Sequence, residues 1–143
     1  MRYVLDACIA VAALKPSEPN HGDALRCVAQ LRRGVHSLVV PSLFPAEVSA
    51  ALTRSGVPGA LVEAFVEELL ASAELLTIGP VRARQIASVT RRTSLRAGDA
   101  AYVWVAEREH LPLVTWDAEI ASRAASGWPG GSPVASPPGG WSA

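Results

Sequence analysis

The sequence contains few of the residues that several classes of protein require. It has two cysteines, Cys8 and Cys27, which form no CxxC motif and are too few for a disulfide framework. Its three histidines show no metal-ligand spacing. The apolar runs are far shorter than the roughly 18 residues of a transmembrane helix, and the first residues lack the pattern of a signal peptide. These absences predict a protein of the reducing cytoplasm with no membrane segment.

Charge of either sign is also limited. The 13 Lys and Arg residues balance the 13 Asp and Glu residues, so the overall charge does not indicate nucleic-acid binding, although a local cluster still can. Lys15 is the only lysine, and the other basic residues are arginines. Half of the 143 residues are hydrophobic, which is enough for the core of one domain of ordinary size.

Strands and helices alternate in the predicted secondary structure. Short apolar runs predict four strands, at Arg2–Leu5, Ser37–Val40, Leu75–Ile78 and Leu113–Thr115. Segments with helical periodicity or helix-capping residues predict helices at 7–14, 23–33, 42–54, 59–73, 81–92, from about 99 onward, and 118–125. This alternation predicts an α/β fold in which a short parallel sheet carries helices on both faces.

Two helices in the middle of the chain carry more detailed expectations. Ser42 is expected to cap the helix over 42–54 with its side chain. The helix over 59–73 is expected to turn an apolar stripe toward the core. The residues of that stripe are Leu61, Val62, Phe65, Val66, Leu69 and Leu70.

The composition changes near residue 127. From Gly127 onward the sequence is rich in Gly, Pro and Ser, which is typical of a segment without firm structure. We therefore predict a single domain over residues 1–126 and a C-terminal tail over residues 127–143. Within the tail, Val134-Ala135 is the place where an edge strand is expected.

Aspartate is rare, and its positions are informative. Of the four aspartates, only Asp23 is not placed at the end of a predicted strand or near the start of the helix that enters the same layer. Asp6 and Asp117 follow strands, Asp99 lies near the start of a helix, and Glu47 lies early in the helix after the second strand. Ligands of open parallel sheets bind beyond the carboxyl ends of the strands. The four carboxylates should therefore converge on one edge of the sheet.

Converging carboxylates suggest a metal site. Like charges a few ångströms apart raise one another's pKa, and a bound divalent cation removes the repulsion. Oxygen ligands without His or Cys select hard ions such as Mg²⁺ or Mn²⁺, which serve phosphoryl transfer. The alternative interpretation is that Asp6 and Asp117 cap helices and that Asp99 favours a helix N-terminus. Each aspartate taken singly fits that alternative, whereas the set with Glu47 favours the metal site.

Four segments carry these residues in order between residue 2 and about residue 125. They are Val4-Leu5-Asp6-Ala7, Pro45-Ala46-Glu47-Val48, Leu95-Arg96 with Asp99-Ala100 and Tyr102-Val103, and Pro112-Leu113-Val114-Thr115 with Asp117. The ordered set resembles the PIN-domain ribonucleases, most closely the VapC-type toxins of bacterial toxin–antitoxin modules. The resemblance implies a single PIN-like domain and an endoribonuclease that depends on Mg²⁺, with Mn²⁺ as a substitute.

The resemblance also implies roles for individual residues. Asp6, Glu47, Asp99 and Asp117 would form the catalytic acidic quartet. Asp6 and Asp99 would bind the principal metal, and the other two would complete its shell or hold a second ion. Thr115 would support the site by hydrogen bonding. Cys8 departs from the Ser or Asn that is common in the family at this position, and a thiol is a weak hydrogen-bond partner.

Partners follow from the resemblance in the same way. It implies an RNA substrate, a cognate antitoxin protein that blocks the site, and a homodimer. The apolar helices from Ser42 to Ala73 are where antitoxin contact is expected, with a partner helix lying in a groove. A rim of arginines would lead RNA phosphates toward the acidic centre, with an ordinary solvated helix face as the alternative. The rim residues are Arg84, Arg91, Arg92 and Arg96.

Two other functions stay open on the sequence. One is a catalytically inactive PIN-fold module that only binds proteins, which the complete quartet argues against. The other is a phosphatase-like phosphoryl-transfer domain whose nucleophile is the aspartate after the first strand. That reading calls for a second Asp two residues after Asp6 or a basic partner late in the chain. Cys8 and the lack of any lysine after Lys15 argue against it.

Overall fold

The computed structural model describes residues 1–126 and 134–135. Its sheet has five parallel strands in the order β3-β2-β1-β4-β5. They are β1 (Arg2–Leu5), β2 (Ser37–Pro41), β3 (Ala73–Leu76), β4 (Leu113–Val114) and β5 (Val134–Ala135). The predicted α/β class with a parallel sheet is confirmed, and Val134-Ala135 forms the expected edge strand. The domain boundary at residue 126 stays a prediction.

The described residues contain seven helices. They are α1 (Ala7–Ala13), α2 (His21–Arg32), α3 (Phe44–Arg54), α4 (Gly59–Leu70), α5 (Pro80–Thr93), α6 (Ala97–Glu109) and α7 (Ala118–Ser126). Each predicted helix is present, although α2 and α6 begin two residues earlier than predicted and α4 ends three residues earlier. In the described part of the chain, no helix is both long enough and apolar enough to cross a bilayer.

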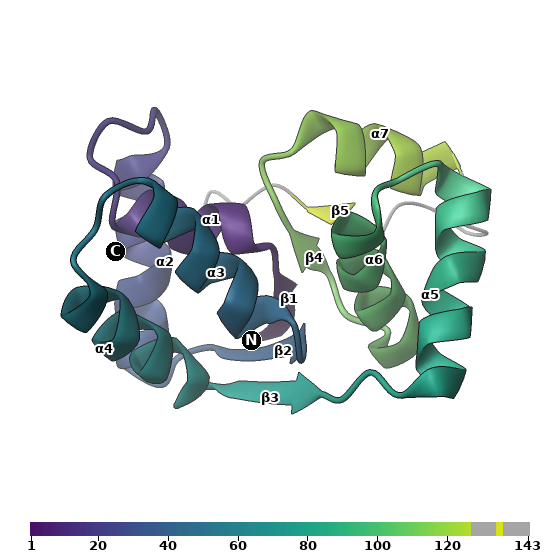
Figure 1. The fold of residues 1–143 in the computed structure, drawn as a ribbon, viewed down its shortest axis with the longest axis horizontal. Coiled ribbons are helices and arrows are strands. Elements are labelled where there is room, and N and C mark those ends of the chain that lie inside the picture. Colours follow the sequence, from purple (N-terminus) through teal and green to yellow (C-terminus); the bar gives the residue numbers. More distant parts are fainter. Residues whose placement is uncertain (127–133, 136–143) are drawn as a thin grey trace.

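The order of the strands determines where a ligand site can form. The chain builds outward from β1 through β2 to β3, then returns to the other side of β1 to form β4. Right-handed crossovers place α1–α4 on one face and α5–α7 on the other when the direction reverses in this way. Figure 1 shows these two groups of helices on either side of the central strands. The reversal between β1 and β4 is a topological switch point, where open α/β sheets bind their ligands.

Helix α6 is the central helix of its face. Its residues from Ala100 to Ala106 are all buried, which is expected of a helix that is apolar around its whole circumference. It packs against β1, β2 and β4. Because the helix is fixed along its length, its first turn, which includes Gly98 and Asp99, is held at the edge of the sheet.

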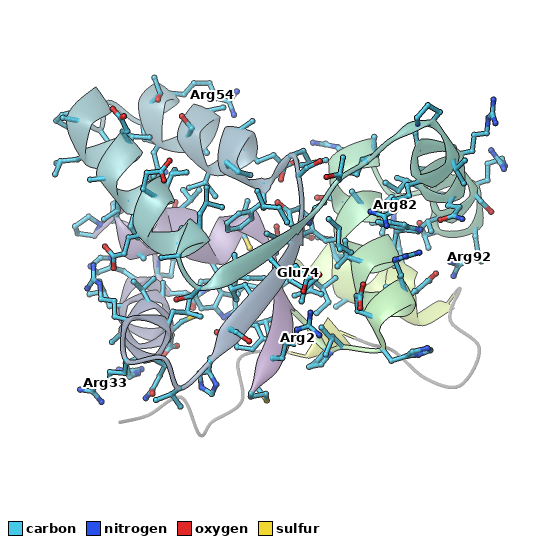
Figure 2. The ribbon with its side chains drawn as sticks, turned by 90° about the horizontal axis from the view of Figure 1, so that it is seen from below. Arg2, Arg33, Arg54, Glu74, Arg82 and Arg92 are labelled. Atoms are coloured by element: carbon cyan, nitrogen blue, oxygen red, sulfur yellow. The ribbon has the colours of Figure 1, made fainter. Side chains whose placement is uncertain are left out.

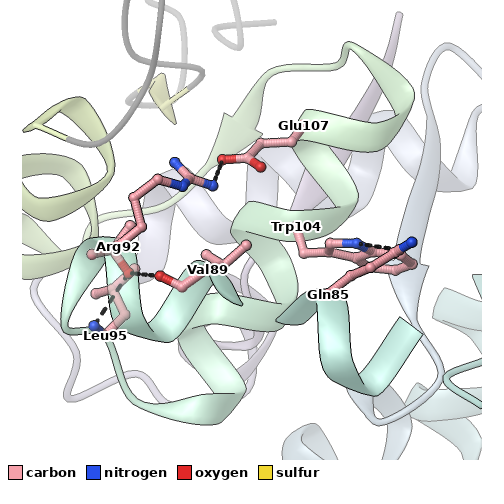
Figure 3. A network of polar contacts seen from close by, with 7 residues as sticks. Gln85, Val89, Arg92, Leu95, Trp104 and Glu107 are labelled. Carbon is pink, nitrogen blue, oxygen red and sulfur yellow. Dashed lines mark hydrogen bonds and ion pairs between the residues drawn. The ribbon is translucent and has the colours of Figure 1, made fainter. Parts of the chain in front are cut away.

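Polar contacts join α6 to its neighbour α5 (Figure 3). Arg92 forms an ion pair with Glu107 at 2.6 Å, and Trp104 Nε1 donates a hydrogen bond to Gln85 Oε1 at 3.1 Å. Arg82 and Arg108 also lie over the Trp104 ring, with guanidinium carbons 5.9 and 5.7 Å from its centroid. These contacts fix α5 against the buried helix that carries Asp99.

The third strand and its surroundings differ from the prediction. The strand was expected at Leu75–Ile78 because that run is apolar, but β3 spans Ala73–Leu76, paired residue by residue with β2. The ladder ends where β2 ends, at Pro41. Ser42 does not cap α3 as predicted, because its Oγ instead accepts a hydrogen bond from the Ile78 N–H at 3.3 Å. Strand pairing, and not local hydrophobicity, sets these bounds.

The apolar stripe of α4 is narrower than predicted. Val62, Phe65 and Leu69 are buried, whereas Leu61 is 58% exposed. The buried residues are spaced by three and four, as one helix face requires. Since α4 packs only along that face, the expectation that Leu61 points inward is wrong.

The two leucines Leu52 and Leu61 give a direct test of this packing. Leu52 on α3 is fully buried, so Leu52→Ala should lower the free energy of unfolding by about 2–5 kcal/mol. Leu61→Ala is the matched control and should change it by about 0.5 kcal/mol or less. Urea denaturation followed by circular dichroism measures both. Equal losses for the two variants would contradict the described packing of α4.

Candidate active site

The carboxyl ends of β1 and β4 bring two site residues together. The strands are parallel neighbours with Leu5 opposite Val114, so the residues that follow, Asp6 and Thr115, lie side by side. Thr115 Oγ1 donates a hydrogen bond to Asp6 Oδ2 at 2.6 Å, and it accepts one from the Asp117 N–H at 3.0 Å. The predicted supporting position of Thr115 therefore has a geometric basis: one hydroxyl orders the aspartates of both strands.

Asp6 is buried, with 6% of its surface exposed, and Cys8 provides two of its hydrogen-bond donors. The Cys8 N–H reaches Asp6 Oδ1 at 3.4 Å, and the Cys8 thiol donates to Oδ2 at 3.0 Å. Although Cys8 is exposed as a whole, its sulfur is turned toward Asp6. Desolvation of the sulfur and the charge of Asp6 raise the pKa of Cys8 to about 12, so the thiol stays protonated and is a poor nucleophile. It contributes a hydrogen bond where the family commonly has Ser or Asn.

Glu47 lies in the same group of helices as Asp6, and its partner Tyr102 lies in the opposite group. It lies in the first turn of α3, and its Oε2 accepts a hydrogen bond from the Tyr102 hydroxyl at 2.6 Å. Burial raises the pKa of Glu47, the hydrogen bond from Tyr102 opposes that rise, and the charge of Asp6 adds to it. Burial and the neighbouring charge of Glu47 raise the pKa of Tyr102, so its hydroxyl remains a donor.

Asp99 lies in the first turn of α6, where the other three carboxylates act on it. Its pKa is raised to about 6 by burial and then, in decreasing order, by the charges of Asp6, Asp117 and Glu47. Arg96, at the N-cap position of the same helix, has the opposite effect. Four acids from four parts of the chain thus share one electrostatic environment, and we call them the carboxylate cluster (Asp6, Glu47, Asp99, Asp117).

The capping interpretation is true of two of these residues. Asp6 is the N-cap of α1, and Asp117 Oδ1 accepts hydrogen bonds from the N–H groups of Glu119 and Ile120 at 2.8 and 3.3 Å. Asp99 accepts no hydrogen bond from the described part of the chain. Capping accounts for where Asp6 and Asp117 stand, and Asp99 lies at a helix N-terminus, as the alternative interpretation also expected. Neither point accounts for the convergence of all four acids.

The chemistry of the cluster suits a hard divalent cation. All four side chains offer carboxylate oxygens, and the pKa of Asp99 is raised first by burial and then by the negative charge of the other three acids. Within the described residues, no three His, Cys, Asp or Glu side chains are close enough to form a preassembled metal site. Mg²⁺ commonly takes only one or two protein carboxylates and fills the rest of its shell with water and phosphate. The donor set fits such an ion.

A pocket opens beside the cluster. It has a volume of about 800 Å³ and extends from Cys8, Glu47 and Gly98 toward Glu18 and Arg54. Its walls are mainly small or apolar residues of α1 and α3. These are Ala7, Val11, Leu43, Ala46, Ala50 and Ala51. The carboxylate of Glu47 is therefore reachable from outside.

Sequence reasoning missed the roles of two residues. In the sequence Tyr102 is part of a motif, but nothing identifies it as the donor to Glu47. Gly98 has no role that the sequence indicates. A Cβ placed on Gly98 would lie 2.5 Å from Glu47 Oε1. Tyr102 stands three residues after Asp99 on one helix face, which was a usable signal. Its partner is 55 positions away, so the contact itself was not visible in the sequence.

The predicted arginine rim divides into two kinds of residue. Arg84, Arg91 and Arg96 are exposed and form no ion pair with described residues. Arg92 instead pairs with Glu107 across α5 and α6 (Figure 3). Figure 2 shows Arg92 at the end of the molecule formed by α5 and Arg33 at the opposite end, directly after α2.

The electrostatics of Asp99 predict an unusual stability profile. Its raised pKa means that the folded state holds a proton that the unfolded state has released, so stability falls as pH rises from about 4 to about 6. Asp99→Asn removes this loss. In EDTA the variant should be about 1–2 kcal/mol more stable than the parent at pH 7.5, and the difference should vanish below about pH 4.

Denaturant unfolding across this pH range measures the effect. Asp23→Asn is the matched control, because it makes the same chemical change at an exposed aspartate that pairs with Arg26 on α2. It should alter stability by no more than about 1 kcal/mol. If Asp99→Asn were less stable than the parent at pH 7.5, the ionised Asp99 would be stabilised by its surroundings, which contradicts the prediction.

Comparison with known proteins agrees with this geometry. The PIN domain family matches residues 3–126. Ribonuclease VapC3 of Mycobacterium tuberculosis, in both strain CDC 1551 / Oshkosh and strain ATCC 25618 / H37Rv, is 37% identical over 110 residues, which cover 73% of this chain and 75% of that protein.

Two solved structures share the fold. PAE2754 from Pyrobaculum aerophilum has a TM-score of 0.64 at 22% identity, over 88% of this chain and 81% of that one. VapBC2 from Rickettsia felis, bound to a DNA fragment from its promoter, has a TM-score of 0.57 at 16% identity, over 82% of this chain and 89% of the matched chain. With the family match and the 37% identical relative, they lead to one conclusion: this chain belongs to the PIN-domain family and is of the VapC type.

Proposed function

We propose that this protein is a divalent-metal-dependent endoribonuclease and the toxin of a toxin–antitoxin pair. The observation that carries the proposal is the carboxylate cluster at the switch point, in which Asp99 is raised to a pKa of about 6 by burial and by three neighbouring acids. Perturbed acids in an accessible site are typical of catalytic centres. The relative named Ribonuclease VapC3 supports RNA as the substrate class.

Asp6 and Asp99 are the residues that would hold the principal cation. Glu47 and Asp117 would complete its surroundings or hold a second ion. Mg²⁺ is the proposed ion, with Mn²⁺ as its substitute, because the donors are carboxylate oxygens. When bound, such an ion neutralises charge on the phosphodiester and lowers the pKa of the water that hydrolyses it.

The protein's own contribution is to orient the carboxylates. Asp6 is held by Thr115 and by both donors of Cys8, so its oxygens have little freedom to rotate. Glu47 is held by Tyr102. This preorganisation places negative charge where a cation and a phosphate must meet. The Cys8 thiol does not act as a nucleophile, because it stays protonated and donates a hydrogen bond to Asp6.

The same observations argue against the two alternative functions. A phosphatase-like domain would need a second Asp two residues after Asp6 or a basic partner late in the chain. Cys8 occupies the first of these positions as a neutral donor, and no lysine follows Lys15. A module that only binds proteins would have no use for four acids whose mutual repulsion destabilises the fold. Hydrolysis with a cation gives a reason for the whole cluster.

The proposed partners are a cognate antitoxin and a second copy of the chain, in the cytoplasm. Antitoxin contact is proposed for the helices between Ser42 and Ala73. A groove of about 410 Å³ between α3 and α4, lined by residues that include Pro45, Val62 and Val66, supports this place. Such a groove suits one face of an amphipathic helix.

Asparagine variants test the proposed catalytic role. Asp6→Asn and Asp99→Asn should each abolish cleavage of a mixed RNA substrate in Mg²⁺ or Mn²⁺, because a neutral amide is a poor substitute for an anionic ligand. Asn still accepts a capping hydrogen bond, so α1 should form normally in Asp6→Asn. Gel assays with EDTA as the control, alongside unfolding curves, make the measurement. Cleavage that survives in a folded variant would refute the assignment.

The arginine rim is tested by the salt dependence of binding. Replacing Arg84 and Arg91 together by Ala should weaken RNA binding and lower the slope of log K against log salt by about 1–2, since each phosphate contact on a single strand contributes about 0.7. Arg92→Ala should mainly lower stability, because it breaks the ion pair with Glu107. Arg33→Ala, at the residue directly after α2, is the control. If the double variant left the salt dependence of RNA binding unchanged, these arginines would belong to an ordinary solvated helix face.

A further inference from the structure

Glu47 is the member of the carboxylate cluster whose oxygens are restrained from the opposite group of helices. Tyr102 donates to Oε2 at 2.6 Å, and Tyr102 itself has no exposed surface. Its ring packs edge-on against Phe44, with centroids 6.5 Å apart and planes at 83°. Phe44 is also fully buried and opens the helix that carries Glu47. The Tyr102 hydroxyl is therefore held in a fixed position beside Glu47.

Gly98 bounds the other oxygen of the same carboxylate. A Cβ at this position would lie 2.5 Å from Oε1 and 3.7 Å from the carboxyl carbon of Glu47. Gly98 does not have the positive φ that requires glycine, unlike Gly34 and Gly56. In the first turn of a helix, glycine is also less favourable than alanine. The close approach of Glu47 is thus the local feature that calls for glycine.

We infer that Tyr102 and Gly98 are positioning residues that together set the orientation of the Glu47 carboxylate toward the cluster. One residue supplies a donor to Oε2, and the other supplies the space that Oε1 occupies. Both belong to α6, the helix that carries Asp99, so the same rigid element places two members of the cluster. The inference rests on the proposed function and extends it to two residues that do not themselves touch the substrate.

Two single substitutions separate positioning from packing. Tyr102→Phe keeps the ring against Phe44 and removes only the hydroxyl. Gly98→Ala adds one methyl group that must displace the carboxylate of Glu47. Matched controls are Tyr3→Phe, which removes the hydroxyl of another fully buried tyrosine, and Gly59→Ala, where a Cβ meets nothing within 4 Å.

The measurements are kcat and KM for RNA, the Mn²⁺ dissociation constant by titration calorimetry, and the melting temperature. Each test variant should lower kcat by about tenfold or more and weaken Mn²⁺ binding several-fold, with KM unchanged, as is usual when a partner of a metal ligand is lost. Gly98→Ala should do so without lowering the melting temperature. The controls should change neither kcat nor Mn²⁺ affinity. Test variants that lose only melting temperature would overturn the inference.

A double-variant cycle shows whether the effect passes through Glu47. In a Glu47→Ala background, Tyr102→Phe and Gly98→Ala should produce no further change in Mn²⁺ affinity. A full additional loss in that background would overturn the inference, because the two residues would then act by another route.

Crystal structures of the variants distinguish failure of this inference from failure of the proposed function. If the parent protein neither cleaves RNA nor binds Mn²⁺, the proposed function fails, and with it the catalytic purpose of the positioning. Even then, the crystal structures still show the orientation of the Glu47 carboxylate. A carboxylate that stays in place in both Tyr102→Phe and Gly98→Ala overturns the inference whether or not the protein is an enzyme.

Discussion

Repulsion among four carboxylates is the constraint around which this fold is arranged. Asp6, Glu47, Asp99 and Asp117 come from both groups of helices and meet where β1 and β4 end. Burial, together with the charges of the other three acids, raises the pKa of Asp99 to about 6. A fold selected only for stability would separate these charges or pair them with bases. In this fold the charges stay close together, and their repulsion lowers stability. A bound cation would remove that repulsion in the working protein.

The surroundings of the cluster serve to keep the acids in place despite this repulsion. Thr115 and Cys8 hold Asp6 from the strand side, and the first turn of α7 holds Asp117. Tyr102 reaches Glu47 from the buried helix α6. In each case the donor stands on an element fixed by packing. Capping and metal binding are compatible uses of Asp117, because both of its capping hydrogen bonds go to Oδ1.

The sequence predicted those parts of the site that depend on local position. Asp6 and Asp117 could be placed because a residue directly after a buried strand lies at the carboxyl edge of the sheet, and the alternation of strands and helices indicated that the sheet is parallel. The role of Tyr102 could not be placed, because its partner Glu47 lies on another helix and only the folded structure brings the two together. The convergence that was expected of the four acids is seen in their electrostatic coupling, while their metal-binding roles stay a prediction.

The misplaced elements have the same cause. The strand expected at Leu75–Ile78 was read from its apolar residues, but pairing with β2 shifts it to Ala73–Leu76. Leu61 was read as part of an apolar stripe, but α4 lies at the margin of the fold and buries only one side. The periodicity of apolar residues predicts which side chains can be buried. Packing against a neighbouring helix or strand determines which of them are buried.

The central claim, that the carboxylate cluster binds a divalent cation, is tested most directly by crystals soaked in Mn²⁺ at pH 7.5 and examined by anomalous scattering. We expect an anomalous peak beyond the carboxyl ends of β1 and β4, with oxygen atoms of Asp6 and Asp99 among the ligands of the ion at about 2.0–2.2 Å. The claim would be contradicted if millimolar Mn²⁺ left no peak among the four carboxylates.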